Sequence, residues 1–220
     1  MTIRFEPDEL AAVDARLEGA SAIDVLRWTF DAFDDVVVAC SFEDVVLAHL
    51  VHSLRPEAPV LFLDTGGHFP ETLELVERVE REWGLRVERT TPPPAAAAWP
   101  CGTAECCEWR KVVPLTSALA GREAWVSAIK RVDAPTRAST PIVGWDAKFE
   151  LVKVNPLATW NDDDIAAYLA MHDLPRHPLW EQGYTSIGCA ATTLRPVEGG
   201  DRRSGRWAGT GKVECGIHQQ

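Results

Sequence analysis

The sequence predicts an α/β fold built around a doubly wound parallel sheet. Short apolar runs occur at residues 36–40 and 60–63, and each is followed by a segment with apolar residues at helical spacing. Continuous apolar runs of this kind are typical of strands buried on both faces. Strands that alternate with helices need crossover connections, which make the strands parallel and place helices on both faces of the sheet. The 220 residues, 46% of them hydrophobic, supply enough apolar side chains for one such core.

The first half of the chain follows this alternation. Apolar residues at helical spacing predict two helices within residues 1–33. Pro70 suits the first turn of a later helix, because the amide hydrogen that proline lacks has no intrahelical partner there. Gly84 suits the end of that helix. After the first two helices we expect a strand at 36–40, a helix at 44–54, a strand at 60–63, a helix at 70–83 and a strand at 85–87.

The second half is less regular. Three prolines at 92–94 and the alanines after them predict a linker or surface loop. Asn161 is a suitable N-cap for a helix that runs through Met171. Beyond Pro175 the chain is rich in Gly, Pro and Arg and is expected to be irregular. The remaining predicted elements are a helix at 106–119 and strands at 124–129 and 152–154.

Composition excludes several classes of protein. The net charge of −11 and the pI of about 5.0 argue against sequence-independent binding to nucleic acid, which needs a basic surface. No stretch approaches the roughly 20 apolar residues of a membrane helix, so no membrane partner is expected. The N-terminus lacks an apolar signal core, which predicts a cytoplasmic protein. Six cysteines in such a protein indicate metal or redox chemistry rather than a disulfide framework.

Two loops are expected at the carboxyl ends of neighbouring strands, where doubly wound sheets bind their ligands. The first contains Ser41, which precedes a helix and suits a phosphate or sulfate. The second contains Asp64, Thr65 and Gly66, where glycine allows a ligand to approach the backbone. Each loop has a simpler explanation, an N-cap at Ser41 and a tight turn at Gly66. Their joint placement favours a nucleotide site.

The C-terminal segment combines a lone cysteine with cations. Cys215 is flanked by glycine and lies near Lys212 and His218. Cations lower the pKa of a thiol, and exposure lets it meet a substrate, so this position suits a mobile thiolate nucleophile. Residues 195–218 are also rich in arginine, which fits either a local anion site or a solvated loop. The adjacent pair Cys106 and Cys107 suits ligation of one metal cluster.

Several motifs in this order resemble the assimilatory sulfonucleotide reductases, and most closely the adenylyl-sulfate (APS) reductases. The resemblance runs from about residue 36 to the end. It is carried by Leu63-Asp64-Thr65-Gly66, Phe69-Pro70-Glu71-Thr72, Cys106-Cys107-Glu108-Trp109-Arg110-Lys111-Val112, Pro135-Thr136-Arg137-Ala138, Gly144-Trp145-Asp146, Gly188-Cys189, Asp201-Arg202-Arg203-Ser204-Gly205-Arg206-Trp207 and Glu214-Cys215-Gly216-Ile217-His218.

The resemblance implies a fold and a reaction. The fold is the adenine-nucleotide α-hydrolase type, with a reductase domain at 1–207 and a mobile tail at 208–220. Cys215 is expected to attack the sulfur of APS, so that AMP leaves and an S-sulfocysteine remains. Thioredoxin, the electron donor, then releases sulfite for cysteine biosynthesis. The implied catalytic residues are Cys215, His218 and Lys111, and the implied substrate-binding residues are Ser41, Asp64, Thr65, Gly66, Arg131, Arg203 and Arg206. Lys111, Arg131, Arg203, Arg206 and His218 are the cations expected to neutralise the sulfate.

The resemblance also implies a [4Fe–4S] cluster on Cys106, Cys107 and Cys189, and here the chain departs from its family. Thr192 stands where a fourth cysteine is expected. Three outcomes are open: a cluster on three thiolates with water or Thr192 at the fourth iron, a substitute thiolate from Cys101, or no stable cluster.

Two other functions stay open. One is a phosphoadenylyl-sulfate (PAPS) reductase or a cluster-poor variant. The other is a non-reductive nucleotide-binding protein on the same sheet, against which Cys215 argues.

Overall fold

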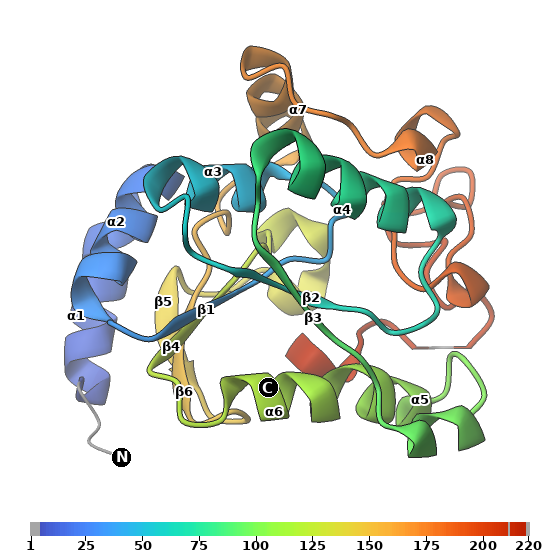
Figure 1. Ribbon diagram of the computed structural model, residues 1–220, viewed down its shortest axis with the longest axis horizontal. Coiled ribbons are helices and arrows are strands. Elements are labelled where there is room, and N and C mark those ends of the chain that lie inside the picture. Colours follow the sequence, from blue (N-terminus) through green and yellow to red (C-terminus); the bar gives the residue numbers. More distant parts are fainter. Residues whose placement is uncertain (1–4, 211, 219–220) are drawn as a thin grey trace.

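A computed structural model of the protein describes residues 5–210 and 212–218. A six-stranded sheet in the order β3-β2-β1-β4-β6-β5 runs through the molecule (Figure 1). In the view of Figure 1, α3 and α4 lie above the sheet and α5 and α6 lie below it. The predicted α/β class with helices on both faces is therefore confirmed.

The first half of the chain matches the predicted alternation of helices and strands. Its elements are α1 (Pro7–Leu17), α2 (Ala22–Ala32), β1 (Val36–Ala39), α3 (Val46–Leu54), β2 (Val60–Leu63), α4 (Pro70–Trp83) and β3 (Val87–Thr90). Gly84 ends α4 with φ at 68°, a left-handed conformation in which glycine has no Cβ to clash.

Two predicted boundaries in this half were wrong. The helix predicted from residue 44 begins at Val46, because the Asp44 carboxylate accepts a hydrogen bond from the Val46 amide at 3.0 Å before the first turn. The third strand was predicted at 85–87 and lies at Val87–Thr90. It is an edge strand with exposed Glu88 and Arg89, so it lacks the apolar run that marks a central strand.

The second half contains one strand that the sequence did not predict. Its elements are α5 (Ala104–Cys107), α6 (Val113–Leu119), β4 (Ala124–Ser127), β5 (Val143–Asp146), β6 (Leu151–Val154), α7 (Asp162–Met171) and α8 (Pro178–Glu181). The unpredicted strand is β5, which contains Gly144 and the exposed Trp145. β5 pairs antiparallel with β6, whereas all other neighbouring strands are parallel. The expectation of a fully parallel sheet fails at this edge.

The helix predicted at 106–119 is interrupted. A π-helical segment, Glu108–Val112, separates α5 from α6. Such segments are rare inside helices and often occur at functional sites. The π-helical segment contains Arg110 and Lys111, so it changes the direction in which both cations leave the backbone.

The strand order reverses between β1 and β4. From β1 the chain proceeds outward through β2 to β3, and then crosses back to place β4 on the other side of β1. This reversal is the switch point at which open α/β sheets bind ligands, beyond the carboxyl ends of the strands. The loops after β1 and β4 therefore border the expected site.

The two faces of the sheet carry separate apolar cores. The larger core packs the first four helices and α7 against β1, β2 and β4. The smaller one contains Leu61, Leu115, Leu119, Trp125 and Leu151, and Ile217 of the C-terminal segment packs against it. The predicted tail is thus docked on the domain in this structure. No helix in the described part of the chain is long and apolar enough to cross a membrane.

Candidate functional site

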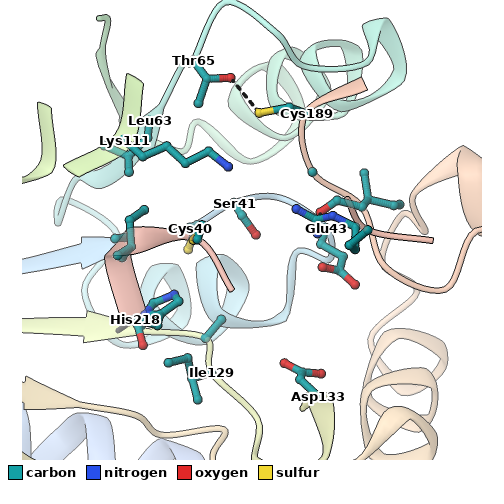
Figure 2. A pocket seen from close by; sticks show the side chains of 18 of the residues that line it. Cys40, Ser41, Glu43, Leu63, Thr65, Lys111, Ile129, Asp133, Cys189 and His218 are labelled. Atoms are coloured by element: carbon teal, nitrogen blue, oxygen red, sulfur yellow. Dashed lines mark hydrogen bonds between the residues drawn. The ribbon is translucent and has the colours of Figure 1, made fainter. Parts of the chain in front are cut away.

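A cavity opens at the switch point, as the sheet topology requires (Figure 2). Cys40 and Ser41 follow β1 and Thr65 follows β2, while Ser127 ends β4 and residues 128–130 follow it. Two further parts of the chain close the cavity, the π-helical segment through Lys111 and the C-terminal segment. Residues from seven separate segments of the chain line this one space: Ser41, Thr65, Lys111, Ser127, Cys189, Arg203, Arg206, Cys215 and His218.

Most of the predicted catalytic and substrate-binding residues meet in this cavity, but three of them do not. Asp64 and Gly66 line a neighbouring pocket together with Arg110. Arg110 donates to the backbone oxygen of Thr65 at 2.8 Å and thereby shapes that turn. Arg131 does not line the cavity. Its guanidinium pairs with Glu18 and donates to the Thr140 oxygen at 2.7 Å.

Lys111 is the central cation of the cavity. Burial disfavours its charged form, yet the neighbouring thiols of Cys215, Cys189 and Cys107 hold the pKa of Lys111 above its ordinary value. The ammonium group is therefore retained in a site where water screens it little. Figure 2 shows the Lys111 side chain extending into the cavity beneath Thr65 and Cys189.

Two arginines add an anion-binding surface. Arg206 donates to the Ser186 hydroxyl at 3.1 Å and to the Ile187 oxygen at 3.2 Å. Gly188 makes room for it, because a Cβ at this position would overlap the Arg206 guanidinium. The Nε groups of Arg203 and Arg206 are buried and have no hydrogen-bond partner within the described residues. Buried donors are rarely left unpaired, so these two indicate a missing acceptor such as an anion.

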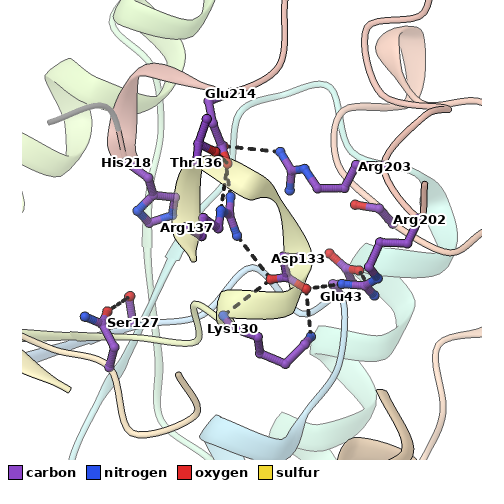
Figure 3. Close-up of polar contacts among 12 residues, drawn as sticks. Glu43, Ser127, Lys130, Asp133, Thr136, Arg137, Arg202, Arg203, Glu214 and His218 are labelled. Carbon is purple, nitrogen blue, oxygen red and sulfur yellow. Dashed lines mark hydrogen bonds and ion pairs between the residues drawn. The ribbon is translucent and has the colours of Figure 1, made fainter. Parts of the chain in front are cut away.

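A buried ion-pair network anchors the C-terminal segment (Figure 3). The Glu214 carboxylate, only 3% exposed, accepts hydrogen bonds from Arg137 Nε at 2.7 Å and Nη2 at 2.9 Å. It also accepts from Arg203 Nη2 at 3.2 Å and from the Thr136 hydroxyl at 3.2 Å. Arg137 in turn donates to Asp133 at 3.1 Å. This network fixes the residue next to Cys215.

Sequence reasoning missed Arg137 and Glu214 as site residues. Both lie in motifs that carried the family resemblance, Pro135–Ala138 and Glu214–His218, so a signal was present. What the sequence could not give was the pairing across 77 positions of the chain. Cys215 lies next to this network. The positively charged side chains of Lys111, Arg137 and Lys153 all interact electrostatically with its sulfur.

His218 differs from its expected role as a cation. Burial and the charges of Lys153, Arg137, Arg203 and Lys111 depress the pKa of His218 well below its ordinary value. The ring is neutral at pH 7 and stacks on Trp125 at a centroid distance of 6.1 Å. Lys153 can only donate, and its Nζ lies 3.4 Å from His218 Nδ1. The proton is then on Nε2, so His218 can donate a hydrogen bond but supplies no charge.

Four cysteines gather beside the cavity. Cys106, Cys107 and Cys189 are buried and Cys101 is exposed, and all are free thiols. The Cys189 sulfur lies 3.6 Å from the Thr65 hydroxyl, and Lys212 donates to the Cys107 sulfur at 3.0 Å. Burial opposes ionisation of Cys189, but Lys111 and the Thr65 hydrogen bond lower its pKa. Within the described residues, no three His, Cys, Asp or Glu side chains are arranged to hold a single metal ion.

Cys40 and His177 are buried residues with structural roles. Burial raises the pKa of the Cys40 thiol far above its usual range, which leaves it a small neutral group. His177 is fully buried and lies between the Thr72 hydroxyl at 2.9 Å and the Leu179 amide at 3.2 Å.

Comparison of the fold with solved structures agrees with this geometry. A phosphoadenylyl-sulfate reductase from Candida auris, crystallised with phosphate, superposes with a TM-score of 0.78 and 22% sequence identity over 88% of this chain and 100% of that one. An FMN adenylyltransferase from Candida glabrata superposes with a TM-score of 0.62 and 19% identity over 88% and 68% of the two chains. Both likenesses concern the fold.

Sequence comparison is more specific. The adenosine 5'-phosphosulfate reductase of Mycobacterium tuberculosis H37Rv is 45% identical over 96% of this chain and 94% of its own length. That of Mycolicibacterium smegmatis is 46% identical over 93% and 91%. Residues 35–195 match the phosphoadenosine phosphosulfate reductase domain, and the chain therefore belongs to this family.

Proposed function

We propose that this protein reduces adenylyl sulfate to sulfite and AMP, with thioredoxin as electron donor, in sulfate assimilation. One observation carries the proposal: Cys215 lies in the cavity at the switch point of the sheet, among Lys111, Arg203 and Arg206. The 45% identity to mycobacterial adenosine 5'-phosphosulfate reductases supports the choice of substrate. Ser41 and Thr65, at the carboxyl ends of β1 and β2, are positioned for the nucleotide part.

The first step is a sulfonyl transfer. The Cys215 thiolate attacks the sulfur of the sulfate group, an S–S bond forms, and the bond from this sulfur to the bridging oxygen breaks. AMP leaves with the bonding electron pair, and S-sulfocysteine remains on the protein. An anionic thiolate and an anionic sulfate repel each other, so the barrier depends on nearby positive charge. Lys111, Arg203 and Arg206 supply that charge, and the neutral His218 donates a hydrogen bond.

The second step needs a thiol from outside. A thiolate of reduced thioredoxin attacks the Cys215 sulfur, sulfite leaves, and a mixed disulfide forms. The second thioredoxin thiol then releases Cys215, so the dithiol supplies both electrons. Cys215 is only half-buried, but its neighbour Glu214 is buried. We propose that the tail, residues 208–220, undocks from the domain at residues 1–207 for this step. Residues 211, 219 and 220 of the tail lie outside the described residues.

A [4Fe–4S] cluster fits the donors beside the cavity, because the four gathered side chains are all soft thiols. Cys106, Cys107 and Cys189 would hold it. When bound, a cluster would fix these segments relative to one another and add its field next to Lys111. The absence of a single-ion arrangement is compatible with this, since each thiolate of such a cluster binds a different iron.

We also propose that the protein works in the cytoplasm. All six cysteines are free thiols in this structure, and the proposed cycle needs a reduced nucleophile. Reducing conditions of that compartment keep thiols in this state.

The test is trapping of the intermediate. Purified protein is incubated anaerobically with APS in the absence of thioredoxin, and the intact mass is measured. We expect the added mass of one sulfonate on Cys215, and release of sulfite when reduced thioredoxin is added. Cys215→Ser should give neither. Full turnover by Cys215→Ser would refute the proposal, and faster sulfite release from PAPS than from APS would favour the phosphoadenylyl-sulfate alternative.

A further inference from the structure

Cys101 lies five residues before Cys106, and the family resemblance assigns no role to it. Cys101 precedes α5, and Thr103 caps that short helix by accepting a hydrogen bond from the Cys106 amide at 3.1 Å. Between them Gly102 adopts a positive φ of 98°, which turns the chain back on itself. The turn brings Cys101 close to α5 despite the cap between them.

The Cys101 thiol faces the other cysteines. It interacts electrostatically with Cys106 and with Cys189, which comes from a distant part of the chain. Cys101 therefore adjoins two of the three cysteines expected to bind iron. Cys101 is exposed, whereas Cys106 and Cys189 are buried.

Thr192 occupies the neighbouring position without offering a suitable donor. Its hydroxyl donates to the Cys189 oxygen at 3.4 Å, so the oxygen is turned toward the backbone. Its methyl group faces Gly102, where a Cβ would come within 3.0 Å of it. A neutral hydroxyl is also a poorer ligand for an iron–sulfur cluster than a soft thiolate. The residue at the expected fourth position thus packs against the turn that carries Cys101.

We propose that Cys101 is the fourth cluster ligand, so that the ligand set of this protein is Cys101, Cys106, Cys107 and Cys189. The fourth thiolate then comes from the segment before α5, and not from the segment after Cys189 where the family resemblance expects it. This inference rests on the proposed function for the identity of the group bound, a [4Fe–4S] cluster rather than zinc. It requires the Cys101 turn to close toward Cys106 and Cys189 when the cluster binds.

A ligand swap tests the proposal. The wild type, Cys101→Ser, and the double variant Cys101→Ser with Thr192→Cys are reconstituted anaerobically with iron and sulfide. Iron and acid-labile sulfide per chain are measured, with a Mössbauer spectrum of the bound iron. We expect about four irons in the wild type, all with cysteine ligation. Cys101→Ser should lose more than half of its iron or show one iron with a different ligand, and Thr192→Cys should restore the wild-type result. Cys215→Ser is the matched control, because it removes a cysteine outside the ligand set and should keep its iron.

Alkylation gives a second readout that does not depend on activity. Iodoacetamide should modify the exposed Cys101 rapidly in the apoprotein and slowly in the cluster-loaded protein, as mapped by mass spectrometry. Equal rates in the two forms, an iron content in Cys101→Ser equal to that of the wild type, or zinc in place of iron would overturn the inference. These results are separable from the proposed function: sulfite formation from APS without iron would overturn the inference alone. A cluster that depends on Cys101 in a protein that forms no sulfite would overturn the function alone.

Discussion

At the scale of single residues, the site depends on side chains that are held in place by their neighbours. Arg206 can reach the cavity because residue 188 has no side chain. The Ser186 hydroxyl and the Ile187 oxygen then orient its guanidinium. Gly188, which precedes Cys189, therefore determines where the Arg206 guanidinium lies in the cavity.

This role predicts the effect of Gly188→Ala. The new methyl group would displace the Arg206 guanidinium, which loses a charge-assisted contact worth about 1.5–3 kcal/mol. We expect kcat/KM for APS to fall by about tenfold to hundredfold, with the folded state retained. Steady-state kinetics and the melting temperature check this. Gly19→Ala is the control, because a Cβ at Gly19 meets nothing within 4 Å, and its kinetics should equal those of the wild type. Unchanged kinetics in Gly188→Ala would contradict the role given to Arg206.

Lys111 leads to a second prediction at this scale. Lys111→Met keeps much of the side-chain volume and removes the buried charge next to Cys215. If this charge stabilises the sulfate group during its transfer to Cys215, the rate constant for formation of S-sulfocysteine should fall by about 10²–10³-fold. Single-turnover mass measurement follows this step without thioredoxin. A defect confined to sulfite release would instead place Lys111 in the second step.

Sequence patterns predicted the identity of many site residues but not their state. The motifs indicated Lys111, Arg203, Arg206 and Cys215, which do meet in one cavity. The neutral state of His218 could not be predicted, because it depends on burial and on four cations from distant segments. Arg131 lies in a similar basic context in the sequence, yet the structure pairs it with Glu18 outside the cavity.

At the scale of secondary-structure elements, contacts of three kinds hold the C-terminal segment on the domain. Ile217 packs on the smaller core, the Gly216 oxygen accepts from Lys148 at 2.6 Å, and Glu214 is buried between Arg137 and Arg203. The buried ion pair gives the docked position its specificity. Few groups hold the segment in the docked position, which fits the undocking proposed for the second step.

Glu214→Gln should weaken the docking of the C-terminal segment on the domain. The variant keeps the size of the side chain but leaves Arg137 partly uncompensated, and breaking a buried pair costs about 3–5 kcal/mol. We expect faster cleavage of the tail by proteases and a fall in kcat of about tenfold or more. Glu198→Gln changes an exposed carboxylate of the neighbouring loop and should change neither. A Glu214→Gln protein with wild-type proteolysis would show that the ion pair does not hold the tail.

Elements were predictable where local pattern and tertiary environment agree. The central strands β1 and β2 are apolar runs, and α4 has proline at its start and glycine at its end, so their positions were confirmed. The edge strands β3 and β5 were misplaced or missed because water-exposed edges do not need apolar runs. The π-helical segment at Glu108–Val112 has the composition of an ordinary helix, and only packing distinguishes it.

At the scale of the whole molecule, an acidic protein maintains a cationic cavity. The net charge is −11, whereas the cavity contains Lys111, Lys130, Arg137, Arg203 and Arg206. Several of these cations are balanced by buried carboxylates such as Asp133 and Glu214, whose pKa values are lowered although burial opposes this. Carboxylates with lowered pKa values stabilise the fold above their unfolded pKa, and this contribution is lost as the pH falls through the folded value.

A buried neutral histidine adds to the same acid sensitivity. His177, the N-cap of α8, joins this helix to α4 through Leu179 and Thr72. Burial lowers its pKa from 6.5 to about 4, against the opposing charges of Glu43 and Glu71. Between these two values the unfolded chain binds more protons at this residue than the folded chain. The free energy of unfolding must therefore decrease as the pH falls from 6.5 to about 4, and His177 has no such effect above pH 6.5.

The expected size of this effect makes it measurable against that of the carboxylates. One pKa unit corresponds to about 1.4 kcal/mol, so His177 contributes a loss of about 3 kcal/mol across the window. Urea unfolding at a series of pH values should show a shallower decrease in His177→Gln than in the wild type, even though the variant is less stable at pH 7. The exposed His172 is the matched control, and His172→Gln should keep the wild-type slope. If the slope of His177→Gln equals that of the wild type, the carboxylates Asp133 and Glu214 account for the acid sensitivity, and protonation of the tail's ion pairs rather than of the helix contact limits the stability of the fold.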